Sequence, residues 1–184
     1  MTQNEYVFTT ISVILGLSIT RLLNAIAGLI RSHDRVAFHW ATALWAGCVM
    51  LFILQLWWVG WELRTSPDWT VVDFFVLVIG AIFVYGAAEL ALPVEDNDLE
   101  DNSELDFQLH SRTLGRLSAL SMLGYFCVGP YVNLTLFKNT PLPSVGFPLL
   151  GAGLMFFIAV RPAWFNVLSV MFAAYAVLIL YLTA

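Results

Sequence analysis

Residues 6–30 read YVFTTISVILGLSITRLLNAIAGLI, and this stretch decides the class of fold. A helix needs about 20 predominantly apolar residues to cross the hydrocarbon core of a bilayer, and the stretch is long enough to do so. The residues before it, MTQNE, contain no Lys or Arg, whereas a cleavable signal peptide begins with a positively charged region. We therefore expect residues 6–30 to remain in the protein as a transmembrane helix.

Apolar stretches of this kind recur along the rest of the chain. Of the 184 residues, 60% are hydrophobic and 11% are charged, whereas an ordinary soluble domain has about 25% charged residues. This composition excludes a soluble globular domain. It predicts an all-α membrane protein, a bundle of about six transmembrane helices that form a single transmembrane domain over residues 1–184. The expected spans are residues 6–30, 38–61, 70–92, 113–136, 145–160 and 163–182.

Local signals refine these boundaries. Asp68 precedes the third span and is its predicted N-cap. Pro130 is expected to bend the fourth span, because a proline inside a helix removes a backbone hydrogen bond. The fifth span, residues 145–160, is short, so a re-entrant segment is the alternative to a full crossing. Pro162 suits the first turn of a helix and predicts a tight hairpin between the last two spans.

The distribution of Lys and Arg predicts the orientation in the membrane. If successive spans alternate in direction, five arginines fall together on one side of the membrane, and Arg64 and Lys138 fall on the other. The five are Arg31, Arg35, Arg112, Arg116 and Arg161. Positively charged residues in short loops favour the cytoplasmic side. We therefore expect both termini outside and the loop of residues 93–111 in the cytoplasm.

That loop is acidic and explains the formal net charge of −5. It holds seven of the 13 acidic residues, namely Glu95, Asp96, Asp98, Glu100, Asp101, Glu104 and Asp106. Its DNDLED stretch lacks the turn glycine and the closing glutamate of a calcium loop. We expect a solvated linker that, under one hypothesis, docks a cytoplasmic protein partner.

Arg21 is the residue of the first span that does not fit an apolar helix. A guanidinium at the bilayer centre costs about 2.5–3.5 kcal/mol on insertion scales, so it should face protein and pair with an anion. Ser18 shares its helix face, and Asn24 lies beside them. Glu89, near the inner end of the third span, is the candidate partner. The alternative is an outward shift of the helix that lets Arg21 reach the inner boundary of the membrane.

Other polar residues are expected at the same inner depth. Arg116 and Ser121 belong to the fourth span and Asn166 to the sixth. Two explanations remain open, a polar cavity in the inner half of the bundle and hydrogen bonds between packed helices. In the outer half, Gln55 and Asn133 are the main polar residues within spans.

The chain also contains a weak internal similarity. Residues 43–53, ALWAGCVMLFI, resemble residues 148–158, PLLGAGLMFFI. With three spans in each half, this similarity would correspond to an inverted 3+3 repeat, as in many transporters. Chance similarity between apolar helices is the alternative.

The sequence offers no chemistry of a familiar enzyme. It has no phosphate-binding loop, no catalytic serine motif, no paired metal-ligand spacing and no basic nucleic-acid patch. Cys48 and Cys127 both lie in apolar runs and are expected to be small hydrophobic residues. We therefore expect no cofactor, no metal and no catalytic residues, and no nucleic-acid partner.

Two functions fit this sequence best, and a membrane enzyme that acts on a lipid or a quinone ranks below both, because no set of acid, base or metal-binding residues supports it. The first is a small channel or carrier with a polar cavity around Arg21 and Glu89, which could act as a homo-oligomer. The second is a membrane interaction subunit that uses the acidic loop for docking. The overall pattern resembles small bacterial inner-membrane proteins, and this resemblance implies that location but no site residues.

Overall fold

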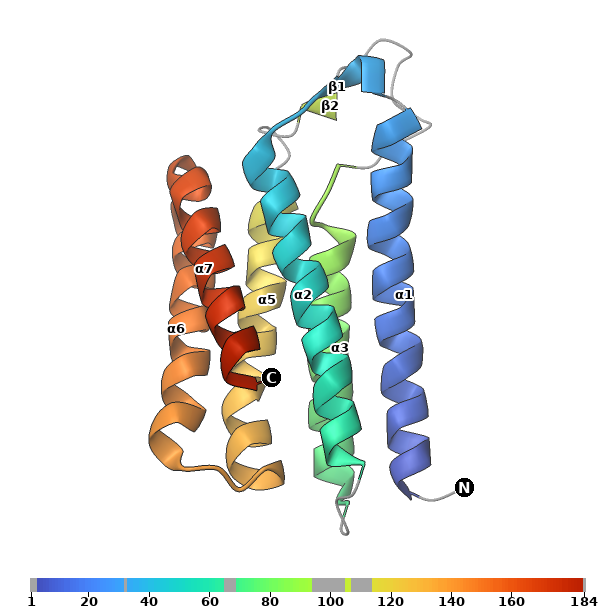
Figure 1. Cartoon of the computed structure of the whole chain (residues 1–184), viewed down its shortest axis with the longest axis vertical. Helices are drawn as coiled ribbons and strands as arrows, with labels where there is room; N and C mark the ends of the chain where they lie inside the picture. The colour runs from blue at the N-terminus through green and yellow to red at the C-terminus, as the bar shows by residue number, and fades with distance from the viewer. Residues whose placement is uncertain (1–2, 32, 65–68, 94–104, 107–113, 184) are drawn as a thin grey trace.

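The computed structural model describes residues 3–31, 33–64, 69–93, 105–106 and 114–183 (Figure 1). The α-helices are α1 (Gln3–Arg31), α2 (Trp40–Leu63), α3 (Val71–Glu89), α5 (Leu114–Tyr131), α6 (Pro141–Val160) and α7 (Phe165–Thr183). The shorter elements are the 3₁₀ turns η1 (His33–Arg35) and η3 (Pro162–Trp164), the π-helix η2 (Val132–Leu136) and the strands β1 (Val36–Ala37) and β2 (Leu105–Asp106).

The predicted membrane spans are present as helices. Six helices are long and apolar enough to cross a membrane, with α5 and η2 counted as one. The chain is therefore a multi-pass integral membrane protein whose outer faces contact lipid. A small addition to the all-α prediction is the parallel pairing of β1 with β2, which ties the α1–α2 connection to the segment that follows α3. Of the seven loop acids, only Asp106 lies within the described residues.

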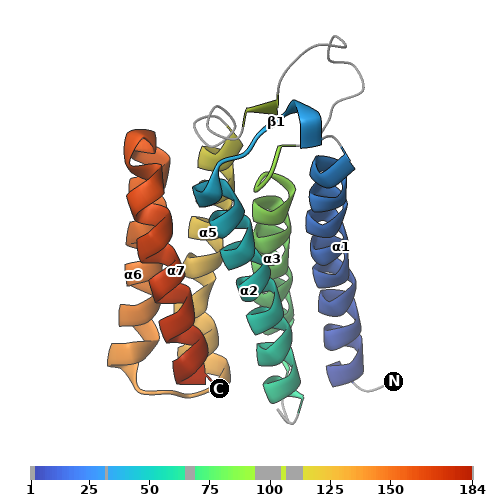
Figure 2. The same cartoon turned by 45° about the horizontal axis from the view of Figure 1, so that its top comes forward.

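The helices pack in two layers. α1, α3, α5 and α6 contact one another in that order, and α2 and α7 cover them, in contact with each other. Figures 1 and 2 show α1 at one edge of the bundle and α6 with α7 at the other. α1 begins and α7 ends at the same end of the bundle, which we call the terminal end. The opposite end, where β1 and β2 lie, is the loop end (Figure 1).

Two contacts fix the register of α1 against α3. The rings of Tyr6 and Phe74 lie 5.7 Å apart, and Arg21 pairs with Glu89 fifteen residues further along each helix. Glu89 is the last residue of α3, and the 19 residues of that helix span about 28 Å, close to the hydrocarbon thickness. Arg21 is therefore level with the end of a spanning helix. This register supports the alternative in which Arg21 lies at the membrane boundary.

Glycines allow the closest helix contacts. A Cβ atom at Gly151 of α6 would lie 2.8 Å from the ring of Phe126 in α5. A Cβ atom at Gly124 of α5 would lie 2.6 Å from the ring of Phe83 in α3. Small residues at such positions let membrane helices approach each other, because lipid supplies no hydrophobic force between them. These two glycines therefore allow α5 to pack closely against both of its neighbours, α3 and α6.

The fifth span is longer than predicted. α6 has 20 residues and begins at Pro141, whereas the sequence placed its start near residue 145. Prolines suit the first turn of a helix, where their missing N–H leaves no intrahelical bond unmade. With these residues included, α6 is long enough to cross the membrane, and the re-entrant alternative is not needed.

The helix irregularities cluster at the terminal end. Pro130 lies inside α5, and the π-helix starts two residues later, in agreement with the expected distortion of this span.

The prediction of Asp68 as the N-cap of α3 is wrong. Thr70 caps this helix, in a capping box in which its hydroxyl accepts from the Asp73 N–H and the Asp73 carboxylate accepts from the Thr70 N–H. The capping box explains the difference, because Asp73 is placed to reach back to residue 70.

Candidate functional site

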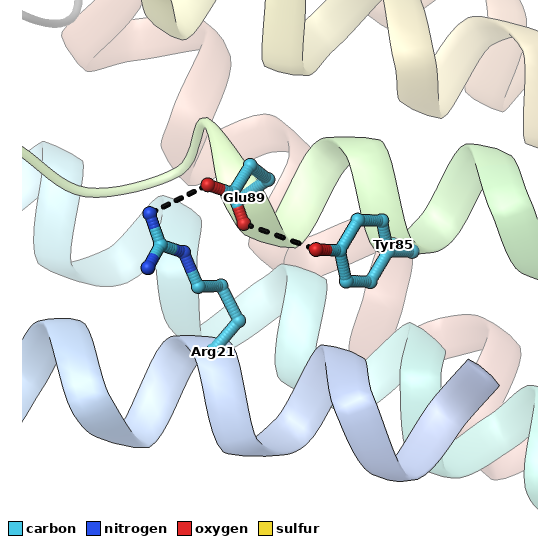
Figure 3. Close-up of polar contacts among 3 residues, drawn as sticks. All are labelled: Arg21, Tyr85 and Glu89. Carbon is cyan, nitrogen blue, oxygen red and sulfur yellow. Dashed lines mark hydrogen bonds and ion pairs between the residues drawn. The ribbon is translucent and has the colours of Figure 1, made fainter. Parts of the chain in front are cut away.

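The predicted pair of Arg21 and Glu89 is present at the loop end (Figure 3). Nη2 of Arg21 lies 2.5 Å from Oε1 of Glu89, and the two side chains are 38% and 33% exposed. The Tyr85 hydroxyl donates a long hydrogen bond of 3.4 Å to the other carboxylate oxygen (Figure 3). Nε of Arg21 is buried and has no hydrogen-bond partner among the described residues. The pair is thus half-buried and its hydrogen bonding is incomplete.

The other polar residues predicted on α1 do not join this pair. Ser18 is fully buried, and its hydroxyl donates to the Ile14 carbonyl of its own helix at 2.9 Å. Such a back-bond satisfies the hydroxyl locally. Asn24 is exposed, one turn beyond Arg21. The three polar residues predicted on α1 therefore have different surroundings. Ser18 is packed in the interior, Arg21 is ion-paired and Asn24 is exposed.

Two of the three remaining predicted residues contact a neighbouring helix. Nε of Arg116 donates to the Ala159 carbonyl at 2.7 Å and ties the start of α5 to the end of α6. Ser121 is half-buried and packs against Gly86 of α3. Asn166 is exposed on the first turn of α7. Of the seven predicted residues, the structure thus brings only Arg21 and Glu89 into direct polar contact.

A buried hydrogen-bond chain joins three helices near the loop end of the bundle. Nε1 of Trp45 donates to the Ser118 hydroxyl at 3.0 Å, and that hydroxyl donates to the Ala87 carbonyl at 2.7 Å. Ala87 lies in the last turn of α3, where backbone carbonyls lack intrahelical partners. The chain therefore joins α2, α5 and α3 and leaves its own polar atoms satisfied.

A cavity of about 850 Å³ lies at the terminal end. Its volume falls within the range of about 300–1,000 Å³ that is usual for small-molecule sites. Residues of α2, α3, α5, η2, α6 and α7 line it. The lining residues at the helix ends, such as Glu62 and Thr183, are exposed, so that the cavity opens at the terminal end.

Aromatic rings form the deep wall of the cavity. They are Phe52, Tyr125, Phe126, Phe147 and Tyr175. The rings of Phe52 and Phe126 meet edge to face at 5.2 Å, and those of Phe52 and Tyr175 are stacked at 6.3 Å. Edge-to-face and stacked arrangements are the preferred geometries of aromatic pairs, so this wall is held in place by its own packing.

Three of the uncharged polar side chains that line the same cavity are half-buried and have no protein partner. Gln55, Tyr125 and Asn133 make no side-chain hydrogen bond to any part of the chain that the structure describes. The Tyr175 hydroxyl, by contrast, donates to the Phe147 carbonyl at 2.9 Å. Polar groups inside a membrane protein are costly unless they are hydrogen-bonded. The cavity therefore offers hydrogen bonds to water or to a ligand.

Charges of both signs flank the mouth. Glu62 at the end of α2 and Lys138 in the α5–α6 connection both line the cavity. Lys138 has a positive φ of 54°, a left-handed conformation that ends the helical segment and is unusual for a residue with a side chain. The backbone N–H of Asn139 donates to the Asn133 carbonyl and closes this turn. The mouth therefore has no net charge from these two groups.

A second hydrogen-bond cluster stands next to the cavity. The buried Asp73 carboxylate accepts from the Tyr131 hydroxyl at 2.8 Å and from the Thr70 hydroxyl at 2.6 Å. Tyr131 directly precedes the π-helix that lines the cavity. Asp73 thus holds the start of α3 against the distorted part of α5, and its carboxylate is satisfied by these contacts.

The residues predicted from the sequence lie near the loop end, and the sequence does not predict this cavity. Four residues around the cavity nevertheless stand out in the sequence. Gln55 and Asn133 are the polar residues noted for the outer half, and Pro130 and Pro148 interrupt the backbone of two helices around it. Prolines within two packed helices are sites of bending, and bent helices leave space between them.

Comparisons of the chain with protein-family models, with curated proteins and with solved structures find no significant match. Among the described residues, no group of three or more His, Cys, Asp or Glu side chains is placed to hold a metal ion. The candidate functional features of the described residues are thus the cavity and the polar contacts of the loop end.

Proposed function

We propose that this protein is a small membrane carrier that binds its ligand in the cavity at the terminal end. The observation that carries the proposal is a cavity that opens at the terminal end and is lined by the unpartnered side chains of Gln55, Tyr125 and Asn133. The loop end opposite it is held by Trp45, Ser118 and the Arg21–Glu89 pair. A cavity open at one end and closed at the other is what one state of an alternating-access carrier requires.

The Arg21–Glu89 pair takes a different role in this proposal from the one expected from the sequence. The sequence placed a ligand pathway around these residues, whereas the described cavity lies at the other end of the bundle. The pair joins the second half of α1 to the last residue of α3. We infer that it stabilises the closed loop end, and that its loss favours the opposite state.

Cysteine accessibility in sealed vesicles tests this proposal without a ligand. In a background of Cys48→Ala and Cys127→Ser, Gln55→Cys reports on the cavity, because Gln55 lines it and is half-buried. Ser169→Cys reports on the loop end of α7, where Ser169 is fully buried and its hydroxyl has no partner among the described residues. We expect a membrane-impermeant maleimide to modify Gln55→Cys from the terminal side and to leave Ser169→Cys unmodified.

Adding Glu89→Gln supplies the second half of the test. A carrier should then expose Ser169→Cys to maleimide from the loop side and show slower modification of Gln55→Cys. Unchanged modification at both positions would show a fixed cavity and would contradict transport. Modification of Gln55→Cys from neither side would contradict an open cavity altogether.

A further inference from the structure

We propose that the cavity recognises an uncharged, planar heterocycle with hydrogen-bond donors and acceptors on its edge, the chemical class of nucleobases and nucleosides. This inference rests on the proposed binding function of the cavity and specifies its ligand. Three properties of the cavity lead to it, namely its lack of charge at depth, its aromatic wall and its amide and phenol groups.

The charge distribution argues for an uncharged ligand. Among the residues that line the cavity, Glu62 and Lys138 are charged, and both lie at helix ends near the mouth. Their charges are opposite, so an ion of either sign meets repulsion as well as attraction there. The other lining residues are uncharged and cannot pair with an ion. An ion bound among them would lose its hydration shell with no opposite charge to offset that free-energy cost.

The aromatic wall argues for a flat ring. Phe52, Phe126 and Tyr175 line the cavity and are buried, because they pack against one another at centroid distances of 5.2–6.3 Å. The rings of Tyr125, Phe137 and Phe147 belong to the same lining and are half-buried, so they are the rings that a flat ligand can reach. Stacking of a nucleobase on an aromatic side chain contributes about 1–3 kcal/mol per base and does not depend on the base. A flexible chain would fill the same volume but would gain no such stacking.

The unpartnered polar groups argue for an edge with both donors and acceptors. Gln55 and Asn133 each carry a carbonyl acceptor and an amide donor, and the Tyr125 hydroxyl both donates and accepts. Amide side chains pair with the edges of purines through two hydrogen bonds. Such a ligand satisfies the groups that the chain itself leaves without partners, and its own polarity is the reason that it needs a carrier to cross a bilayer.

Binding of adenosine to the detergent-purified full chain tests this inference. The readout is the rise in melting temperature with ligand concentration, which reports affinity for the folded state. Three further compounds separate the contributions: AMP keeps the ring but adds charge, ribose lacks the ring, and a short-tailed ubiquinone has a ring with acceptors only. We expect stabilisation by adenosine at the lowest concentration of the four.

Variants locate the binding in the cavity. Tyr125→Phe keeps the ring and removes one hydrogen bond, so the affinity for adenosine should fall about five-fold. Gln55→Met, of similar volume, should weaken it at least as much. Tyr181→Phe is the matched control, because Tyr181 is 81% exposed and lies outside the cavity lining. It should leave the affinity unchanged.

The outcomes separate this inference from the proposed function. Equal or stronger stabilisation by AMP, ribose or the ubiquinone would overturn the assignment of ligand class. Binding of adenosine that is insensitive to both Tyr125→Phe and Gln55→Met would overturn the assignment of the site. Neither result would alter cysteine accessibility, which needs no ligand, so a carrier with another substrate would still be recognised there.

Discussion

At the scale of single residues, the Arg21–Glu89 pair gives the sharpest stability prediction. Exposed ion pairs contribute about 0–1 kcal/mol, and removal of one partner of a buried pair costs about 3–5 kcal/mol. Both side chains here are about one third exposed. We therefore expect Arg21→Gln to lower the free energy of unfolding by about 1–3 kcal/mol, measured by titration of mixed micelles with a denaturing detergent.

The double variant Arg21→Gln with Glu89→Gln is the control for this experiment. It removes the carboxylate that the single variant leaves without its cation, so part of the lost stability should return. A double variant that is less stable than the single one by the full cost of Glu89→Gln would show that the two residues act independently. The pair would then not hold the loop end together.

The sequence predicts the partners in this pair but not their depth in the membrane. A lone arginine in an apolar helix requires an anion, and the expected depth of Glu89 makes it the candidate partner. The sequence left two depths for Arg21 open, because a long helix can slide along the membrane normal. The contact of Tyr6 with Phe74 supports the boundary position by fixing the register of α1 and α3, and such a ring contact has no sequence signature.

At the scale of elements, the contact of α5 with α6 predicts a contrast between two glycines of one helix. A methyl group at Gly151 would lie 2.8 Å from the ring of Phe126, which is buried and packed against other rings. At Gly153, two residues further along, a methyl group would meet nothing within 4 Å. Overpacking costs about 1–3 kcal/mol, whereas Ala is favoured over Gly in an open helical position by about 1 kcal/mol.

We therefore expect Gly151→Ala to lower the melting temperature in detergent and Gly153→Ala to leave it unchanged or raise it slightly. The two substitutions are chemically identical and lie on the same helix, so a general effect on α6 would move both. Equal melting temperatures for the two variants would contradict the close approach of α5 and α6 at Phe126.

The elements themselves were largely predictable, because the length of an apolar run decides whether a helix crosses a bilayer. The start of α6 was not, since Pro141 and Pro143 look like loop residues until a helix is known to begin with them. The π-helix after Pro130 could not be predicted from the sequence either. The proline signals a disturbance in the helix, but the form of that disturbance depends on the packing of its neighbours.

At the scale of the whole molecule, the sequence predicts the number of spans but not the cavity. In a soluble helix, polar residues mark the outer face. In lipid, the outer face is as apolar as the packed interior, so the pattern of a helix says little about which side faces its neighbours. The cavity arises from the relative placement of α2, α3, α5, α6 and α7. Gln55 and Asn133 can be recognised as cavity-lining residues only once the packing of these helices is known.

The side of the membrane on which the cavity opens is the last prediction. Arg31, Arg35 and Arg161 lie at the loop end, whereas Arg64 and Lys138 lie at the terminal end. Because positive charges favour the cytoplasmic side, the terminal end and the cavity mouth should face away from the cytoplasm. In the cysteine-free background, Leu142→Cys at the start of α6 marks the terminal end, and Asp34→Cys in η1 marks the loop end; both side chains are highly exposed.

We expect an impermeant maleimide to modify Leu142→Cys in intact cells and Asp34→Cys only after the membrane is broken. The opposite pattern would mean that the cavity opens to the cytoplasm and that the arginine excess does not control insertion. In that case the ion pair of Arg21 would close the outer end, and the state described here would be the one that receives ligand from inside. The direction of labelling thus decides which side loads the cavity, whatever its ligand is.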